Sequence, residues 1–91
     1  MNIIKRNNQL EAFIPQKIKT SIINSAYDIN YSLTNSDINL ILNHILRVLN
    51  NLHRDNEYTS VYEVRGIIYC VLIELGFREI AISYVNTNFN K

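Results

Sequence analysis

The sequence NIIKRNNQLEAFI, residues 2–14, contains two short apolar segments on either side of Asn7-Asn8. Asparagine tolerates the left-handed backbone conformation that a two-residue hairpin turn requires. The segments 2–6 and 9–14 are therefore predicted to pair as an N-terminal β-hairpin. Lys5 and Arg6 are expected at its turn.

Apolar residues recur at helical spacing after this hairpin. The spacing predicts four helices, over residues 15–29, 36–53, 61–75 and 77–89. Pro15 suits the first turn of the first helix, where its missing N–H group removes no hydrogen bond. The predicted fold class is α+β and mainly α: a β-hairpin followed by a four-helix bundle.

Capping residues mark three of the helix ends. Thr34 or Ser36 can cap the second helix. Ser60-Val61-Tyr62-Glu63 has the form of a capping box, in which the Ser60 hydroxyl accepts from the Glu63 N–H and the Glu63 carboxylate reaches back to Ser60. Gly76 follows the third helix, where a left-handed cap needs a residue without a Cβ.

Size and composition indicate one domain over residues 1–91. A chain of 91 residues with 47% hydrophobic content forms one core, because smaller pieces would bury too little apolar surface to offset their chain entropy. A nucleic-acid partner is not expected, because the formal net charge is only +1 and nucleic-acid-binding domains usually carry a basic excess.

No apolar run approaches the roughly 18 residues that a membrane-spanning helix needs, so no membrane partner is expected. The single cysteine, Cys70, cannot form an intrachain disulfide and has no neighbours at metal-ligand spacing. A cytoplasmic protein without a structural metal is therefore predicted. Because Cys70 lies among the apolar residues 67–72, it is expected to be buried.

The sequence contains no motif of a hydrolase, kinase or metalloprotease, so the protein is not expected to be an enzyme. His44 and His53 are expected to have structural roles, on the second helix and at its end. Charge concentrates around Lys5, Arg6 and Lys17, although composition alone is also typical of an ordinary charged surface turn.

Over essentially its whole length the chain resembles the ATP-cone family, in these segments: Ile3-Ile4-Lys5-Arg6-Asn7-Asn8, Glu11-Ala12-Phe13, Lys17-Ile18, Thr59-Ser60, and Phe77-Arg78-Glu79-Ile80-Ala81 with Tyr84. The family has a β-hairpin lid over a four-helix bundle. It occurs at the N-terminus of ribonucleotide reductase large subunits and in the zinc-ribbon repressor of their operons. This sequence contains neither a zinc ribbon nor a reductase barrel.

The resemblance implies an allosteric module that binds ATP or dATP, with or without Mg²⁺, as an effector and holds no tight cofactor. The implied partners are ribonucleotide reductase or its regulators, and a homo-oligomer. The implied nucleotide-binding residues are Lys5, Arg6 and Lys17 near the phosphates, Glu11 near the adenine amino group, Thr59 at a helix N-terminus, and Lys91 after the final helix.

Two positions depart from the family pattern. Asn8 replaces the usual turn glycine, and Glu63 stands where some members place a histidine towards the phosphates. A carboxylate there would repel a triphosphate, so an alternative stays open: a degenerate cone that binds no nucleotide and serves as a protein–protein interaction module. DNA binding by a helix-turn-helix is disfavoured, because the helix over 61–75 begins Val61-Tyr62-Glu63 without basic residues.

Overall fold

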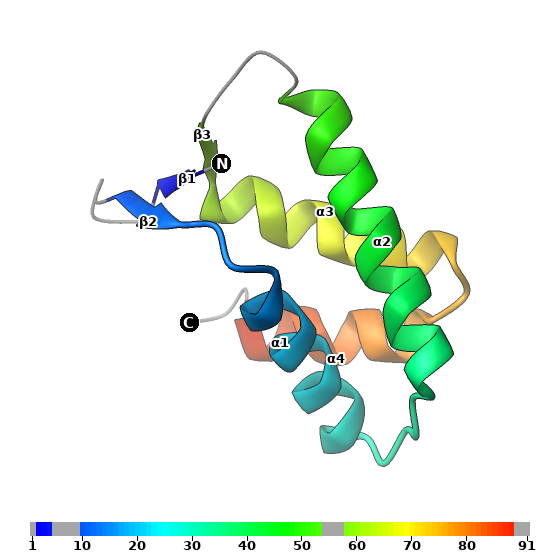
Figure 1. The fold of residues 1–91 in the computed structure, drawn as a ribbon. Helices are drawn as coiled ribbons and strands as arrows, with labels where there is room; N and C mark the ends of the chain where they lie inside the picture. The colour runs from blue at the N-terminus through cyan, green and yellow to red at the C-terminus, as the bar shows by residue number, and fades with distance from the viewer. Residues whose placement is uncertain (1, 5–9, 54–57, 89–91) are drawn as a thin grey trace.

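A computed structural model describes residues 2–4, 10–53 and 58–88 of the chain. It is mainly helical, with a small sheet (Figure 1). In chain order the elements are β1 (Asn2–Ile4), β2 (Leu10–Ala12), α1 (Pro15–Asp28), α2 (Asn35–Leu52), β3 (Tyr58–Ser60), α3 (Val61–Glu74) and α4 (Arg78–Asn88).

The sheet has the strand order β2-β1-β3. β1 pairs with β2 in the antiparallel sense, as expected for residues 2–14, although each strand has only three described residues. The predicted turn at Asn7-Asn8 lies outside the described residues. β3 was not predicted, and it pairs with β1 in the parallel sense. β3 has only three residues, and the last of them, Ser60, is also the N-cap of α3, so the strand is too short to show the alternation by which a strand is recognised.

Both α1 and α3 end in a Schellman motif, in which the residue after the helix adopts a left-handed conformation. After α1 this residue is Asn30, with φ of 57°. The Asn30 N–H donates to the Tyr27 carbonyl at 3.0 Å and the Tyr31 N–H donates to the Ala26 carbonyl at 2.8 Å. Asparagine therefore closes α1, because its short polar side chain tolerates this conformation.

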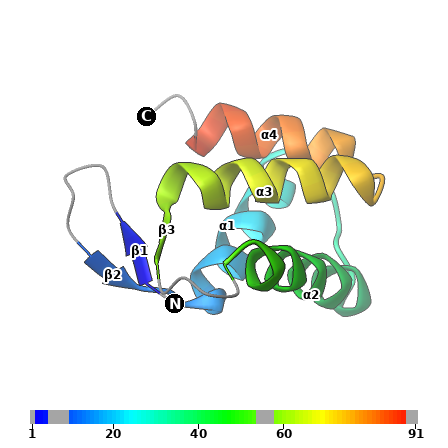
Figure 2. The same cartoon turned by 90° about the horizontal axis from the view of Figure 1, so that it is seen from above.

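Gly76 has the same role after α3, with φ of 91°. Its N–H donates to the Ile73 carbonyl at 3.1 Å, and the Phe77 N–H donates to the Leu72 carbonyl at 2.7 Å. The left-handed cap predicted at Gly76 is confirmed. The resulting reversal lets α4 return along α3, and Figure 2 shows the two helices side by side in opposite directions.

Thr34, not Ser36, caps α2. The Thr34 Oγ1 accepts from the Asp37 N–H at 3.0 Å, and the Asp37 Oδ2 accepts from the Thr34 N–H at 3.3 Å. This reciprocal pair is a complete capping box. The capping box thus gives an acceptor to the Thr34 N–H of the cap and to the Asp37 N–H of the first turn, and it fixes the start of α2.

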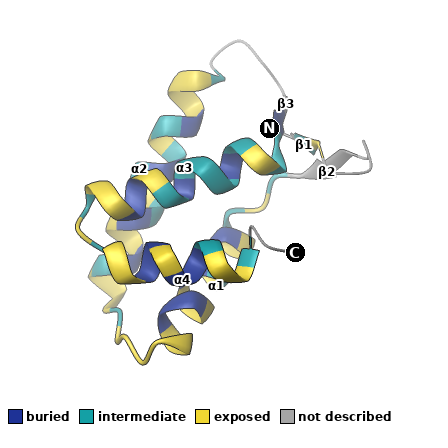
Figure 3. Ribbon diagram, turned by 180° about the vertical axis from the view of Figure 1, so that it is seen from behind, coloured by how far each residue is buried: buried dark blue, intermediate teal, exposed yellow. Residues whose placement is uncertain are grey.

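One hydrophobic core joins the four helices (Figure 3). α1 and α3 both pack against α4, and α2 packs against α3. Ser83 Oγ of α4 donates to the Ser25 carbonyl of α1 at 2.8 Å, a buried hydrogen bond between two distant parts of the chain. The core side chains are Ile18, Ile22, Ala26, Ile41, Ile45, Leu49, Val64, Ile68, Val71, Leu72, Ile80, Ala81 and Tyr84.

The expectation that Cys70 is buried is wrong, since Cys70 is exposed. α3 is apolar on nearly every side, so the sequence does not show which of its faces packs inward. The structure buries Val64, Ile68, Val71 and Leu72 and leaves Cys70 outside. Within the described ranges, no helix combines the length and the apolar character that crossing a bilayer requires.

Candidate functional site

A pocket of about 240 Å³ lies at the end of the bundle that carries the sheet. At this end α1 and α3 begin and α4 ends (Figure 2). The pocket is lined by side chains of β1, α1, α3 and α4: Ile3, Ile14, Lys17, Ile18, Ser21, Val61, Val64, Arg65, Ile68, Tyr84 and Asn88. Segments from both ends of the sequence therefore meet in one concave site.

Apolar side chains make up most of the pocket wall, with polar groups among them. Ile3 of the sheet, Ile18 of α1 and Ile68 of α3 are among the apolar lining residues, beside which the less polar part of a ligand can lie. A few placed polar groups on a mainly apolar wall are typical of small-molecule sites. The pocket can therefore hold a ligand with one apolar and one polar part.

Two cationic side chains line the same pocket. Lys17 stands in the first turn of α1, as the sequence predicted, and Arg65 comes from the early part of α3. The sequence did not indicate that Arg65 would line this pocket, because Arg65 is far from the predicted cluster along the chain and only the fold brings the two helices together. Both cations favour an anionic ligand.

The helix ends at this site add partial charges. The N-terminal ends of α1 and α3 present the positive end of the helix dipole, and the C-terminal end of α4 presents a negative one. Asn88 moderates the latter, because its Nδ2 donates to the Tyr84 carbonyl at 2.9 Å. The N-terminal ends are partly satisfied as well, because the Lys17 N–H donates to the Ile14 carbonyl and the Glu63 N–H donates to Ser60 Oγ. The formal charges of the lining are those of Lys17 and Arg65.

Tyr84 is 3% exposed and contributes to the pocket wall. Burial raises the pKa of its hydroxyl to about 12, and the nearby Arg65 charge partly opposes this effect. The hydroxyl therefore stays protonated at neutral pH. Tyr84 therefore adds no negative charge to the pocket lining at neutral pH.

Thr59 lies in β3, one residue before the cap of α3, which refines its predicted place at a helix N-terminus. It is 3% exposed, and its Oγ1 has no hydrogen-bond partner among the residues that the structure describes. A buried hydroxyl without a partner is costly, so such a group is a natural contact for a ligand. Thr59 is opposite Ile3 in the β1–β3 register, although it does not line the pocket itself.

The remaining predicted site residues are less fully described. The backbone of Glu11 in β2 is paired with Ile3 of β1, so Glu11, Ile3 and Thr59 form one row across the sheet. Lys5, Arg6 and Lys91 lie outside the described residues. The structure thus brings Lys17 to the pocket and places Glu11 and Thr59 on the two strands beside Ile3.

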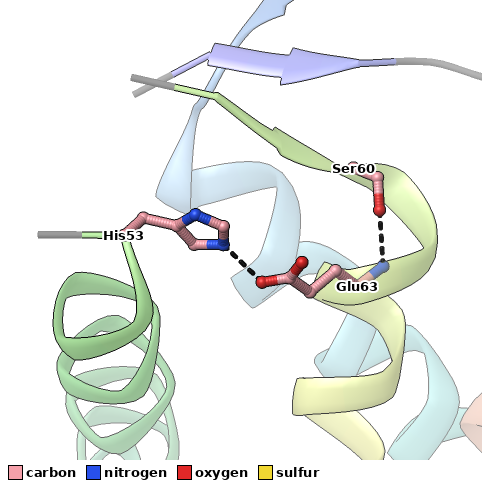
Figure 4. Close-up of polar contacts among 3 residues, drawn as sticks. All are labelled: His53, Ser60 and Glu63. Carbon is pink, nitrogen blue, oxygen red and sulfur yellow. Dashed lines mark hydrogen bonds and ion pairs between the residues drawn. The ribbon is translucent and has the colours of Figure 1, made fainter. Parts of the chain in front are cut away.

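The Glu63 side chain is not the capping-box carboxylate that the sequence predicted. Ser60 Oγ does accept from the Glu63 N–H, at 3.0 Å, but the Glu63 carboxylate Oε1 contacts His53 Nε2 (Figure 4). His53 is the C-cap residue of α2, and its position depends on tertiary packing that the local motif cannot report. The carboxylate consequently bridges α3 to α2.

A second His–Glu contact joins the same two helices. His44 Nε2 of α2 lies 3.6 Å from Glu74 Oε2 of α3. Both histidines therefore connect helices, which agrees with the structural roles expected for them. Among the described residues, no group of three or more acidic, histidine or cysteine side chains could hold a metal ion.

Comparison with known proteins identifies one family. The family model described as the ATP cone domain matches residues 1–88. No curated protein matches the chain. The family match spans almost the whole sequence and includes every element described above. The chain therefore belongs to the ATP-cone domain family.

Proposed function

We propose that this chain binds ATP or dATP as an allosteric effector, and that nucleotide binding changes its association with a partner. ATP-cone domains are nucleotide-binding regulatory domains, not catalytic ones. The observation that carries the proposal is the pocket at the sheet end of the bundle, where Lys17 and Arg65 stand beside an apolar wall.

In this proposal the pocket wall receives the adenine ring, and the cationic side chains bind the phosphates. Lys5, Arg6 and Lys17 make charge-assisted hydrogen bonds to phosphate oxygens, and Lys91 adds a further positive charge. Thr59 is a further proposed contact; it lies in β3 outside the pocket lining, and its buried hydroxyl has no hydrogen-bond partner among the described residues. Glu11 accepts from the adenine amino group, and the N-terminal strands act as a lid.

The output of such a module is a population shift. A nucleotide that binds one conformation or oligomeric state more tightly favours that state, by no more than its difference in affinity. The proposed partner is ribonucleotide reductase, one of its regulators, or a second copy of this chain. Mg²⁺, where present, would accompany the nucleotide phosphates.

Isothermal titration calorimetry with ATP and dATP, each with and without Mg²⁺, tests nucleotide binding. Saturable heat with either nucleotide, together with a rise in melting temperature, is the expected result. GTP is the matched control, because it has the same triphosphate but lacks the adenine amino group. An absence of heat at millimolar ATP and dATP would rule out the proposal.

A second function is favoured by the apolar side chains that the helices leave outside. Leu40 and Leu52 of α2 are 52% and 58% exposed, and Ile82 of α4 is 47% exposed. A degenerate cone could use such groups for a protein–protein contact without nucleotide. Self-association measured by sedimentation that is unchanged by ATP would favour this alternative.

A further inference from the structure

Glu63 and Arg65 are two residues apart on α3 and carry opposite charges. On an α-helix this spacing turns one side chain about 200° away from the other. The structure shows the same divergence in its contacts, since Glu63 contacts His53 of α2, whereas Arg65 lines the pocket together with Lys17 and Tyr84. Arg65 therefore lines the pocket, whereas the Glu63 carboxylate is turned towards α2.

The charges of the pocket have one sign. Its charged lining residues are Lys17 of α1 and Arg65 of α3, and no carboxylate lines it in the described ranges. Arg65 is half-buried, beside apolar groups such as Val64 and Ile68. Charges next to an apolar wall are screened less than they are in water, so each attracts an anion more strongly.

The size of the pocket limits what it can receive. At about 240 Å³ it falls below the roughly 300–1,000 Å³ typical of sites that enclose a whole ligand. A nucleoside triphosphate would therefore place one part in the pocket and extend outside it. Lys17 and Arg65 are among the lining residues, so an anionic part of a ligand held there would be attracted by both charges.

We propose that Arg65 is a phosphate-binding residue of this site, and that it forms an anion subsite with Lys17 across the space between α1 and α3. The guanidinium is planar and can donate two parallel hydrogen bonds to phosphate oxygens, which an ammonium group cannot match in geometry. This inference rests on the proposed nucleotide function and adds a residue that sets selectivity for phosphorylated ligands.

The test compares two variants. Arg65→Gln removes the charge and keeps an aliphatic stem, and Arg65→Lys keeps the charge but cannot donate the two parallel hydrogen bonds of a guanidinium. Arg47→Ala is the matched control, because Arg47 is exposed on α2 and α2 contributes no lining residue. Circular dichroism and thermal melts establish that each variant is folded. Each protein is then titrated by calorimetry with ATP, ADP, AMP and adenosine.

Arg65→Gln is expected to weaken ATP binding about tenfold or more, since hydrogen bonds to charged groups are the strong ones. The loss should shrink along the series ATP, ADP, AMP and vanish for adenosine. Arg65→Lys should fall between wild type and Arg65→Gln. Arg47→Ala should bind as wild type does.

The possible outcomes distinguish the Arg65 subsite from the nucleotide function on which it rests. If wild type binds ATP and folded Arg65→Gln binds it equally well, the Arg65 subsite is wrong and the nucleotide function stands. Inorganic tripolyphosphate is the second probe: if wild type binds it but not ATP, and Arg65→Gln abolishes this binding, the subsite stands and the nucleotide function is wrong. If wild type binds neither probe, both claims are overturned.

Discussion

Burial determines the pH range in which the Tyr84 hydroxyl loses its proton. Its pKa in the folded protein is about 12, above the ordinary value of 10.0, because burial disfavours the charged phenolate. A raised folded-state pKa means that the stability linked to this group is complete below pH 10 and is lost as pH rises from 10 towards 12. The shift corresponds to about 2–3 kcal/mol at most.

Tyr84→Phe should therefore change the alkaline stability profile. Urea unfolding at pH 8 and pH 11 measures this, and the wild-type protein should lose more of its unfolding free energy between these values than the variant does. Other tyrosines and lysines titrate in both proteins, so the difference between the two isolates Tyr84. Equal losses in both proteins would show that Tyr84 does not titrate as described.

The contact between His53 and Glu63 makes a second residue-scale prediction. A half-buried pair of this kind stabilises modestly, by about 0.5–1 kcal/mol. Glu63→Gln and His53→Ala should each destabilise the fold at pH 6, and the double variant should cost less than the sum of the two. Chemical denaturation of the four proteins gives the coupling energy. Strict additivity would mean that the contact contributes nothing.

At the scale of elements, the two glycines of the chain differ in backbone conformation, one inside α3 and one just after it. Gly66 is inside the helix and Gly76 follows it with φ of 91°, and an added Cβ would meet no atom within 4 Å at either position. Any difference between them is therefore a backbone effect and not a clash. Gly66→Ala therefore serves as the matched control for Gly76→Ala.

Gly66→Ala should stabilise the protein by about 0.5–1 kcal/mol, because alanine loses less backbone entropy in a helix. Gly76→Ala should destabilise it by about 1–2 kcal/mol, because an L-residue is strained in the left-handed region. Thermal melts of the two variants provide the comparison. A destabilised Gly66→Ala or an unaffected Gly76→Ala would contradict the assigned conformations.

Local patterns predicted the helices well. Their bounds agree with the predicted ranges to within one residue at each end, because a proline, hydroxyl caps at Thr34 and Ser60, and Gly76 mark ends through local hydrogen bonds. β3 was missed, since its partner β1 is far away in the sequence and its three residues show no period. Strand pairing of this kind is a tertiary property.

The site was predictable only in part. Lys17 was predicted to bind the nucleotide phosphates, which stays a prediction, and the structure places it in the lining of the pocket. Arg65 was missed, and Glu63 was assigned to a local cap, because their directions depend on how α2 and α3 pack. Cys70 was wrongly expected to be buried, since an almost uniformly apolar helix does not show its outward face.

At the scale of the whole molecule, the four helices share one core, and the cation-lined pocket lies at the end that carries the small sheet. The family match over residues 1–88 and the lining of this pocket both support the proposed nucleotide binding. A ligand bound there would contact α1, α3, α4 and β1 together. Binding is therefore expected to stabilise the fold as a unit, and the gain grows with ligand concentration above Kd.

Titration of the wild-type protein with ATP, followed by calorimetry and by the melting temperature in parallel, tests this account most directly. The account predicts saturable heat, a melting temperature that rises with ATP concentration, and weaker responses to both GTP and adenosine. The account is contradicted if millimolar ATP and dATP give neither heat nor any shift in the melting temperature of the folded protein.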